Sequence, residues 1–176
     1  QFILLAVLAI GLGACNEIDA MRSEDVVGNE PVAALLDRAE AGEVDAQLAI
    51  GLHYRNIATQ LEGSDRARSQ SEALRWFTVA AEKGDSNAQT ELGVMLVTAE
   101  GNSRNLTEGH RWLSRAGEAG QAAALYMLGD LSKNGEGVPP NPELAVSFWR
   151  QAADQGHAGA LHRLGQAHEE GLGVDP

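Results

Sequence analysis

Five histidines are the side chains of this chain best suited to metal binding or proton transfer, and they are scattered. The last three are five and six residues apart, which turns an α-helix by about 500° and 600° and places them on different faces. No His-Glu-x-x-His motif, which gathers two zinc ligands on one helix, is present. The sequence therefore predicts no metal site. The histidines are His53, His110, His157, His162 and His168.

Arrangements for nucleophilic or acid–base catalysis are missing from the sequence as well. There is no Gly-x-Ser-x-Gly turn. The acidic pairs Glu24–Asp25 and Glu169–Glu170 have the pattern of surface charge. The glycine-rich segments lack the Lys-Ser/Thr and the preceding strand of a phosphate-binding loop. We therefore expect no catalytic residue, no cofactor and no enzymatic activity.

The single cysteine, Cys15, excludes both an intramolecular disulfide and a cysteine-based zinc site. It follows an uninterrupted apolar run over residues 2–12. This run is shorter than the roughly 20 residues that span a bilayer, and it has the length of a signal-peptide core. The position of Cys15 therefore points to export of the chain.

The segment Leu12-Gly13-Ala14-Cys15 resembles the lipobox of bacterial lipoproteins. The resemblance implies cleavage after Ala14, a lipid on the Cys15 thiol and a further acyl chain on the new amino group; several chains hold a protein firmly on a membrane. Residues 1–14 then form a signal peptide that is incomplete, because Gln1 stands where Met and a basic segment are expected. An ordinary signal peptide that happens to contain a cysteine is the alternative.

Location follows from the same motif. A lipoprotein of this kind faces the periplasm of the bacterial cell envelope. Asn16 follows the cysteine in place of Asp, which favours the outer over the inner membrane in enteric bacteria. Residues 15–30 are polar and show no sustained helical stripe, so we expect a flexible tether that holds the folded part off the membrane.

Composition favours packed helices and disfavours a nucleic-acid partner. The chain of 176 residues is long enough for one compact domain or a short repeat array. Hydrophobic residues make up 44% but aromatic residues only 5%, so much of the apolar content is Ala and Leu, which suits close helix packing. A net charge of −12 repels phosphate backbones.

An internal repeat dominates the chain after residue 30. Four segments align without gaps, and each opens on a glycine and closes on another glycine. Their opening glycines are spaced by 42, 36 and 36 residues, so the first repeat carries six extra residues, which fall between Tyr54 and Ala73. The aligned segments are Gly42–Gly51, Gly84–Gly93, Gly120–Gly129 and Gly156–Gly165.

A second helical segment precedes each of the last three opening glycines, and each contains a pair of bulky residues. The pairs are Trp76-Phe77, Trp112-Leu113 and Phe148-Trp149. Residues 31–42 read as an unpaired second helix, with Pro31 suited to its first turn. We therefore expect a half repeat at 31–42, repeats at about 43–84, 85–120 and 121–156, and a half repeat at 157–176, with more repeats in the intact protein.

These segments resemble the Sel-like repeat (the Sel1-like repeat), a relative of the tetratricopeptide repeat, over about residues 31–176. The recurring Ala-x-x-x-Leu-Gly, the Gly-x-Gly-Val loops and the aromatic pair before Ala-Ala carry the resemblance. It implies an all-α fold, an α-solenoid of antiparallel helix-turn-helix repeats with a right-handed superhelix. The loops of the first two repeats depart from the pattern, so other shapes are expected there.

One stripe of each first helix is expected to be buried, because its apolar residues recur every four positions. Gly51, Gly93, Gly129 and Gly165 fall inside these helices, where glycine costs up to about 1 kcal/mol relative to alanine. We expect the bulky pair of the second helix to approach there too closely for a Cβ. Trp76, Trp112 and Phe148 are thus interpreted as core residues. The stripe is Ala46, Ile50, Tyr54, Ala88, Leu92, Leu96, Ala124, Leu128, Ala160 and Leu164.

The opposite positions of the first helices are candidates for a binding groove. Superhelices of helix pairs present a concave surface that first helices commonly line. The alternative is that adjacent repeats or the six-residue insertion cover these side chains. The positions are Leu48, Ala49, Leu52, Thr90, Glu91, Val94, Tyr126, Met127, Asp130, His162, Arg163 and Gln166, and we predict that Leu48, Leu52, Val94, Tyr126 and Met127 contact an extended peptide or a partner helix.

The function predicted from these features is that of a lipid-anchored envelope scaffold or adaptor that binds other proteins. Resemblance to other repeat lipoproteins implies assembly or regulation of an envelope machine. The alternative is a binding module for peptidoglycan or polysaccharide, which a row of exposed aromatic residues would favour; here only Tyr126 meets that criterion. The third hypothesis is an enzyme, but the sequence shows no convergent polar groups that could form an active site.

Overall fold

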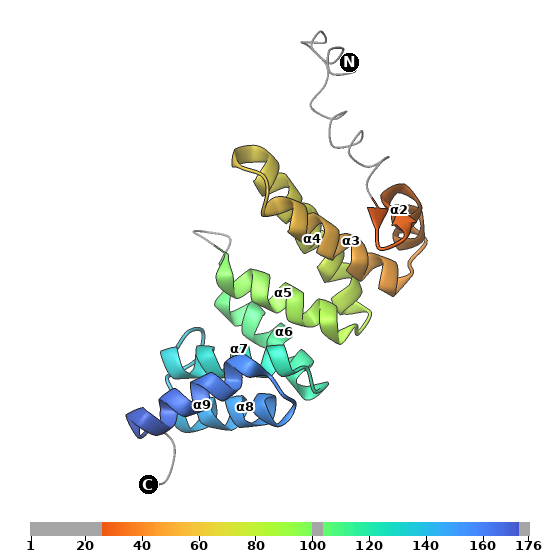
Figure 1. Cartoon of the computed structure of the whole chain (residues 1–176). Coiled ribbons are helices and arrows are strands. Elements are labelled where there is room, and N and C mark those ends of the chain that lie inside the picture. Colours follow the sequence, from red (N-terminus) through yellow and green to blue (C-terminus); the bar gives the residue numbers. More distant parts are fainter. Residues whose placement is uncertain (1–25, 100–103, 173–176) are drawn as a thin grey trace, which may run out of the picture.

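The computed structural model describes residues 26–99 and 104–172 of the chain (Figure 1). This part holds a two-stranded hairpin and eight helices. The expected signal peptide, Cys15 and most of the expected tether lie outside the described residues. The strands are β1 (Val26–Val27) and β2 (Glu30–Pro31), and the helices are α2 (Val32–Glu40), α3 (Val44–Ala58), α4 (Gly63–Glu82), α5 (Ser86–Thr98), α6 (Leu106–Glu118), α7 (Ala122–Asn134), α8 (Pro142–Asp154) and α9 (Ala158–Glu170).

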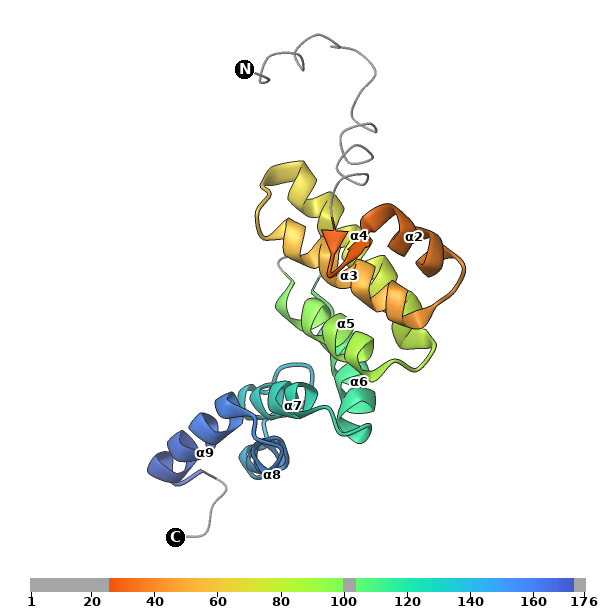
Figure 2. The same ribbon diagram turned by 45° about the vertical axis from the view of Figure 1, so that its right-hand side comes forward.

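The helices pack in antiparallel pairs, α3 with α4, α5 with α6 and α7 with α8, and each pair contacts the next. The result is an elongated array that runs from the hairpin and α2 at one end to α9 at the other (Figures 1 and 2). Three clusters of buried residues follow one another along it. This architecture confirms the prediction of an all-α solenoid of helix-turn-helix repeats.

Glycines and polar caps make the turn between successive pairs. Gly84, Gly120 and Gly156 have φ values of +93°, +85° and +83°, a left-handed conformation that ends a helix. The next helix can begin at once: the Asp85 carboxylate accepts the Ala88 N–H at 2.7 Å and caps α5. The predicted helix stops at these glycines are therefore confirmed.

Within each pair, a glycine of the first helix lies against a bulky residue of the second. A Cβ added to Gly51 would lie 2.6 Å from the Phe77 ring, and one added to Gly93 would lie 2.6 Å from Leu113. A Cβ on Gly129 would overlap the Trp149 ring, which is only 1% exposed. The expected close approach is thus confirmed at Gly51, Gly93 and Gly129, where the second residue of each bulky pair makes it, but not at Gly165, where no described atom lies within 4 Å of the Cβ position.

The burial pattern departs from the sequence prediction at three residues. Trp76 and Trp112 are buried as expected, but Phe148 is only half-buried and packs against both the middle and the last core cluster. Leu96 is half-buried because it borders a cleft described below. Leu164 is half-buried on α9, where nothing lies within 4 Å of the Cβ position of Gly165. The other residues of the predicted stripe are buried.

The expected tether over residues 15–30 is wrong for its last five residues. Val26 pairs with Pro31 and Val27 with Glu30 in an antiparallel hairpin. Arg38 of α2 holds the hairpin in place, because it bonds Glu30 at 2.8 Å and also Glu43 at 2.7 Å. The periodicity of apolar residues could not predict this hairpin, because each strand has only two residues.

The six extra residues of the first repeat lengthen its hairpin. Helix α3 has 15 residues and α4 has 20, against 13 in each of α5, α6, α7 and α8. The connection between α3 and α4 has four residues, whereas the connections α5–α6 and α7–α8 have seven. Two residues gained in α3, seven gained in α4 and three lost in the connection account for the insertion. Residues 63–69 of α4 therefore have no counterpart in α6 or α8.

Candidate functional site

The first helices lie side by side and carry the predicted groove residues in half-buried positions. Leu48 and Leu52 of α3 pack on the first core cluster, Val94 of α5 and Met127 of α7 on the middle one, and Tyr126 on the last. Each keeps part of its side chain accessible. The band is thus partly exposed. This exposure lies between the two alternatives from the sequence, an open groove and a surface covered by adjacent repeats.

Polar contacts connect neighbouring first helices along this band. Arg55 of α3 forms an ion pair with Glu91 of α5. Arg163 of α9 donates from Nε and Nη2 to the two Asp130 oxygens of α7, both at 3.0 Å, and this bidentate bond raises the pKa of Arg163. Three charged residues predicted to face a partner are therefore engaged between repeats.

One groove position needs correction, and one residue of the band has a covered face. Thr90 is buried, and its hydroxyl donates to the Ser86 carbonyl at 2.9 Å, so it faces the inside of the array. The Tyr126 ring stacks on the His157 ring with centroids 4.7 Å apart. One face of Tyr126 is therefore covered by the start of the next first helix.

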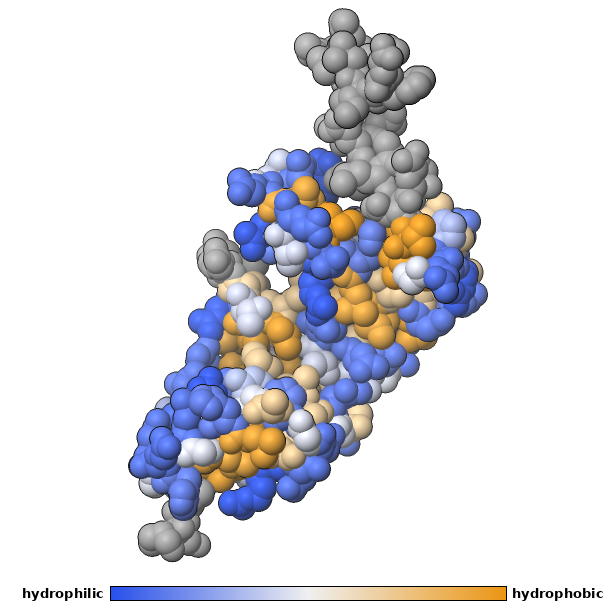
Figure 3. Space-filling model, viewed as in Figure 1, coloured by the Kyte–Doolittle hydropathy of each residue, from blue (hydrophilic) through white to orange (hydrophobic). Residues whose placement is uncertain are grey.

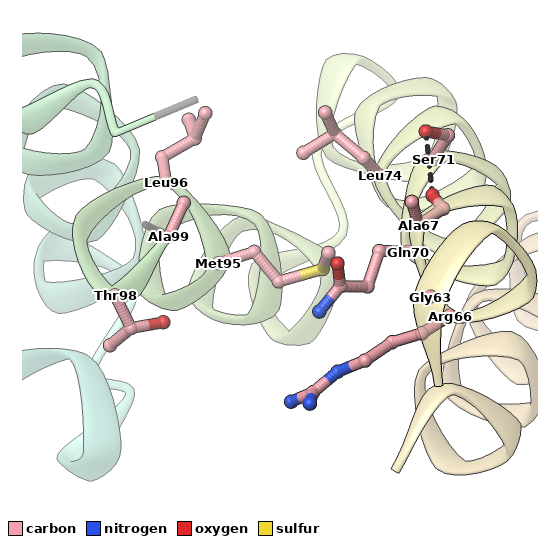
Figure 4. Close-up of a pocket in the computed structure, with 10 residues that line it drawn as sticks. All are labelled: Gly63, Arg66, Ala67, Gln70, Ser71, Leu74, Met95, Leu96, Thr98 and Ala99. Carbon is pink, nitrogen blue, oxygen red and sulfur yellow. Dashed lines mark hydrogen bonds between the residues drawn. The ribbon is translucent and has the colours of Figure 1, made fainter. Parts of the chain in front are cut away.

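One local departure from regular packing is a cleft of about 570 Å³ between the first half of α4 and the last turn of α5. The surface is hollowed there between the end of the α3–α4 hairpin and α5 (Figure 3). Leu74 and Leu96 approach from opposite sides, Met95 and Gln70 extend toward each other, and Arg66 lies along the mouth (Figure 4). The described lining is therefore mixed, with Leu74, Met95 and Leu96 as its large apolar side chains and Arg66 as its cation.

A second cleft of about 590 Å³ lies between α5 and α7. Met127, a predicted contact residue, lines it together with Val97 and Leu131. Its charged residues are already paired, since Arg104 binds Glu136 and Asp130 binds Arg163. A ligand in this cleft would therefore meet mainly apolar side chains, because Arg104, Glu136 and Asp130 are already neutralised in ion pairs.

The histidines are dispersed, as their spacing predicts. His157 caps α9, because its Nδ1 accepts the Ala160 N–H at 3.2 Å, and His162 and His168 are exposed. Within residues 26–99 and 104–172, no three His, Cys, Asp or Glu side chains gather in a way that could hold a metal ion. No helix in this same part of the chain has the length and apolar character needed to cross a bilayer.

Sequence reasoning missed the α4 side of the first cleft. Arg66 lies in the insertion, where no repeated position exists for alignment, and the chemistry of Leu74 is not repeated at the equivalent His110. The available signal was the spacing of 42 residues against 36, which marks where one pair must differ from its neighbours.

Comparisons with known proteins agree with this geometry. The Sel1 repeat pattern matches residues 44–85, 86–121, 122–157 and 158–176. Proteins built from this repeat generally mediate protein–protein interactions. No curated protein matches the chain.

Two solved structures are similar. A Sel1 repeat protein from Oxalobacter formigenes is 36% identical, with a TM-score of 0.61 over 77% of this chain and 97% of the other. The c5321 protein, a protective antigen of uropathogenic Escherichia coli strains with an SLR fold, is 30% identical, with a TM-score of 0.71 over 84% of this chain and 31% of the other. This chain thus spans about a third of that antigen. On the repeat match and these likenesses, the chain belongs to the Sel1 repeat family.

Proposed function

We propose that this chain is a protein-interaction scaffold of the bacterial cell envelope, held there by a lipid on Cys15, and that its first helices receive the partner. The observation that carries the proposal is the row of α3, α5, α7 and α9. Arg55–Glu91 and Asp130–Arg163 join neighbours in this row, and the half-buried apolar side chains of Leu52, Val94 and Met127 lie on it. Such a row is a ready platform for an extended segment or a helix.

The chemistry of the row supports a protein partner over a glycan. Sugar rings bind best on open aromatic faces, and the Tyr126 ring is already stacked on His157. The remaining band is aliphatic or sulfur-containing, and such side chains adapt to apolar side chains of another protein. Through such contacts the scaffold would assist assembly or regulation of an envelope machine.

The groove is tested by photo-crosslinking. Benzoylphenylalanine at position 127 should give crosslinks to an envelope protein, whereas the same group at Arg150, an exposed residue of α8, should give none. Tyr126→Ala and Leu52→Ala should weaken capture of that protein while the circular dichroism spectrum is kept. Unchanged capture by both variants would show that the groove is not the binding surface.

The anchor is tested separately. The protein expressed from its complete gene should yield an amino-terminal peptide that starts at Cys15 and carries acyl chains, as measured by mass spectrometry. Cys15→Ser should lose the lipid and leave the membrane fraction. An unmodified Cys15 in the wild-type protein would remove the anchor from the proposal and leave the scaffold role to be judged on the groove alone.

A further inference from the structure

One position of the repeat differs between the first and the last junction of a second helix with the next first helix. Val146 of α8 is 2% exposed, and Ala167 of α9 in the same cluster is 0% exposed, so that junction is closed. The equivalent residues of the first junction, Leu74 of α4 and Met95 of α5, are half-buried and line the cleft. The first junction is therefore open where the last is packed.

The insertion explains the opening. Residues 63–69 of α4 extend the helix past the point where α6 and α8 begin. Arg66 and Ala67 of this extension, with Gln70 next to it, form the outer wall of the cleft, opposite Thr98 and Ala99 at the end of α5. Residues present in the first repeat alone thus supply three of the ten described lining residues, Gly63, Arg66 and Ala67.

The described lining of the cleft carries a positive charge. Arg66 is the one charged residue among the described residues that line the cleft, and in the described chain it forms no ion pair. Its exposed side chain extends from α4 toward α5, while the half-buried Leu74 and Leu96 lie on the other side of Gln70 and Met95 (Figure 4). The Gln70 amide, beside Met95, offers both a donor and an acceptor between these two zones.

We infer that this cleft binds a short extended segment of a partner protein in which a large apolar side chain stands next to a carboxylate. The inference rests on the proposed scaffold function and gives it a site and a partner chemistry. The apolar side chain enters between Leu74 and Leu96, the carboxylate accepts from the Arg66 guanidinium, and Gln70 bonds the segment's backbone.

Size and charge both fit this occupant. A volume of about 570 Å³ lies within the range of roughly 300–1,000 Å³ that encloses a small ligand, which suits a few residues and not a whole helix. The net charge of −12 repels acids at long range, but charges beyond about 8 Å are screened at physiological salt. Among the described residues that line the cleft, Arg66 is the charged one that a bound segment meets.

The test is a selection of phage-displayed random decapeptides on the immobilised full chain, followed by affinity measurements with the enriched peptides. We expect the enriched sequences to place Asp or Glu within two residues of Phe, Leu, Met or Trp. Arg66→Gln should weaken their binding about tenfold, the loss expected for one charge-assisted hydrogen bond. Arg150→Gln, which removes an exposed arginine of α8, is the matched control and should bind like the wild type.

A second variant separates binding from folding. Ala67 is exposed, so Ala67→Trp should fill the cleft and abolish binding while the unfolding midpoint stays unchanged. Enriched peptides without acidic residues, or full binding by both Arg66→Gln and Ala67→Trp, would overturn the inference. If Tyr126→Ala alone abolishes binding, the scaffold function survives and the cleft is not its site. Enrichment of no peptide, with dodecanoate bound in an Arg66-dependent way, would overturn it in favour of a fatty-acid site.

Discussion

Val146 and Leu74 hold the same position of the repeat, yet their surroundings differ. Val146 is buried beside Ala167 in a closed junction, whereas Leu74 faces a cleft because α4 carries seven residues that α8 lacks. The contacts that recur every 36 residues, such as Gly129 with Trp149, hold the array together. The cleft beside Arg66 lies in the first repeat, which is six residues longer than the next two. The regular repeat contacts therefore stabilise the array, and the longer repeat provides the candidate site for specific binding.

The largest effect should come from the closed region. Trp149→Ala removes a 1% exposed ring from the Gly129 contact and should lower the free energy of unfolding by about 3–5 kcal/mol. Leu74→Ala, in the open junction, should cost less than about 2 kcal/mol because its side chain is already half-exposed. Urea unfolding followed by circular dichroism measures both. Equal losses would remove the distinction between the two junctions.

The glycines allow a matched pair of substitutions that differ in sign. Gly129→Ala places a Cβ inside the Trp149 ring and should destabilise by about 1–3 kcal/mol. Gly165→Ala meets open space and should stabilise by up to about 1 kcal/mol, the helix-propensity gain. Thermal unfolding of both variants decides the matter. A destabilised Gly165→Ala would mean that another surface approaches α9 as closely as Trp149 approaches α7.

The polar contacts between first helices should contribute less than the core. A double-mutant cycle on Asp130 and Arg163 should give a coupling energy of about 1 kcal/mol, at the upper end for accessible ion pairs, because the contact is bidentate. The same cycle on Arg55 and Glu91 serves as the comparison within the first junction and should give a smaller value. The reverse order would contradict the view that the first junction is the looser one.

The smallest effect concerns His110, which occupies the position of Leu74 and Val146 in the middle junction. Burial lowers the pKa of His110 below its ordinary value of 6.5. The unfolded chain then takes up a proton more readily than the folded one. The contribution of neutral His110 to the free energy of unfolding is therefore fully present above pH 6.5, and it should decrease as the pH drops below that value. Unfolding curves between pH 8 and 5 should show this loss, and His110→Gln should flatten it; an unaltered slope would assign the loss to other groups.

Much of the fold follows from the sequence for a physical reason. Repeated Ala, Leu and Gly positions report on contacts that each pair makes with the next, so aligning repeats predicts the stripe and the stops at Gly84, Gly120 and Gly156. A structural feature without a second copy in the chain cannot be predicted by aligning repeats. The hairpin at Val26–Pro31 and the cleft beside Arg66 both arise from segments with no second copy to align.

Removing residues 63–68 tests most directly whether binding depends on the break in the period. The deletion leaves seven residues between Asn56 and Gln70, the number that separates the corresponding residues of the next two repeats, and shortens α4 from 20 to 14 residues, against 13 in α5 and α6. We expect the shortened chain to keep native helical content and a similar unfolding midpoint, while its affinity for the selected peptides falls at least about tenfold. Native folding with wild-type peptide affinity would contradict it.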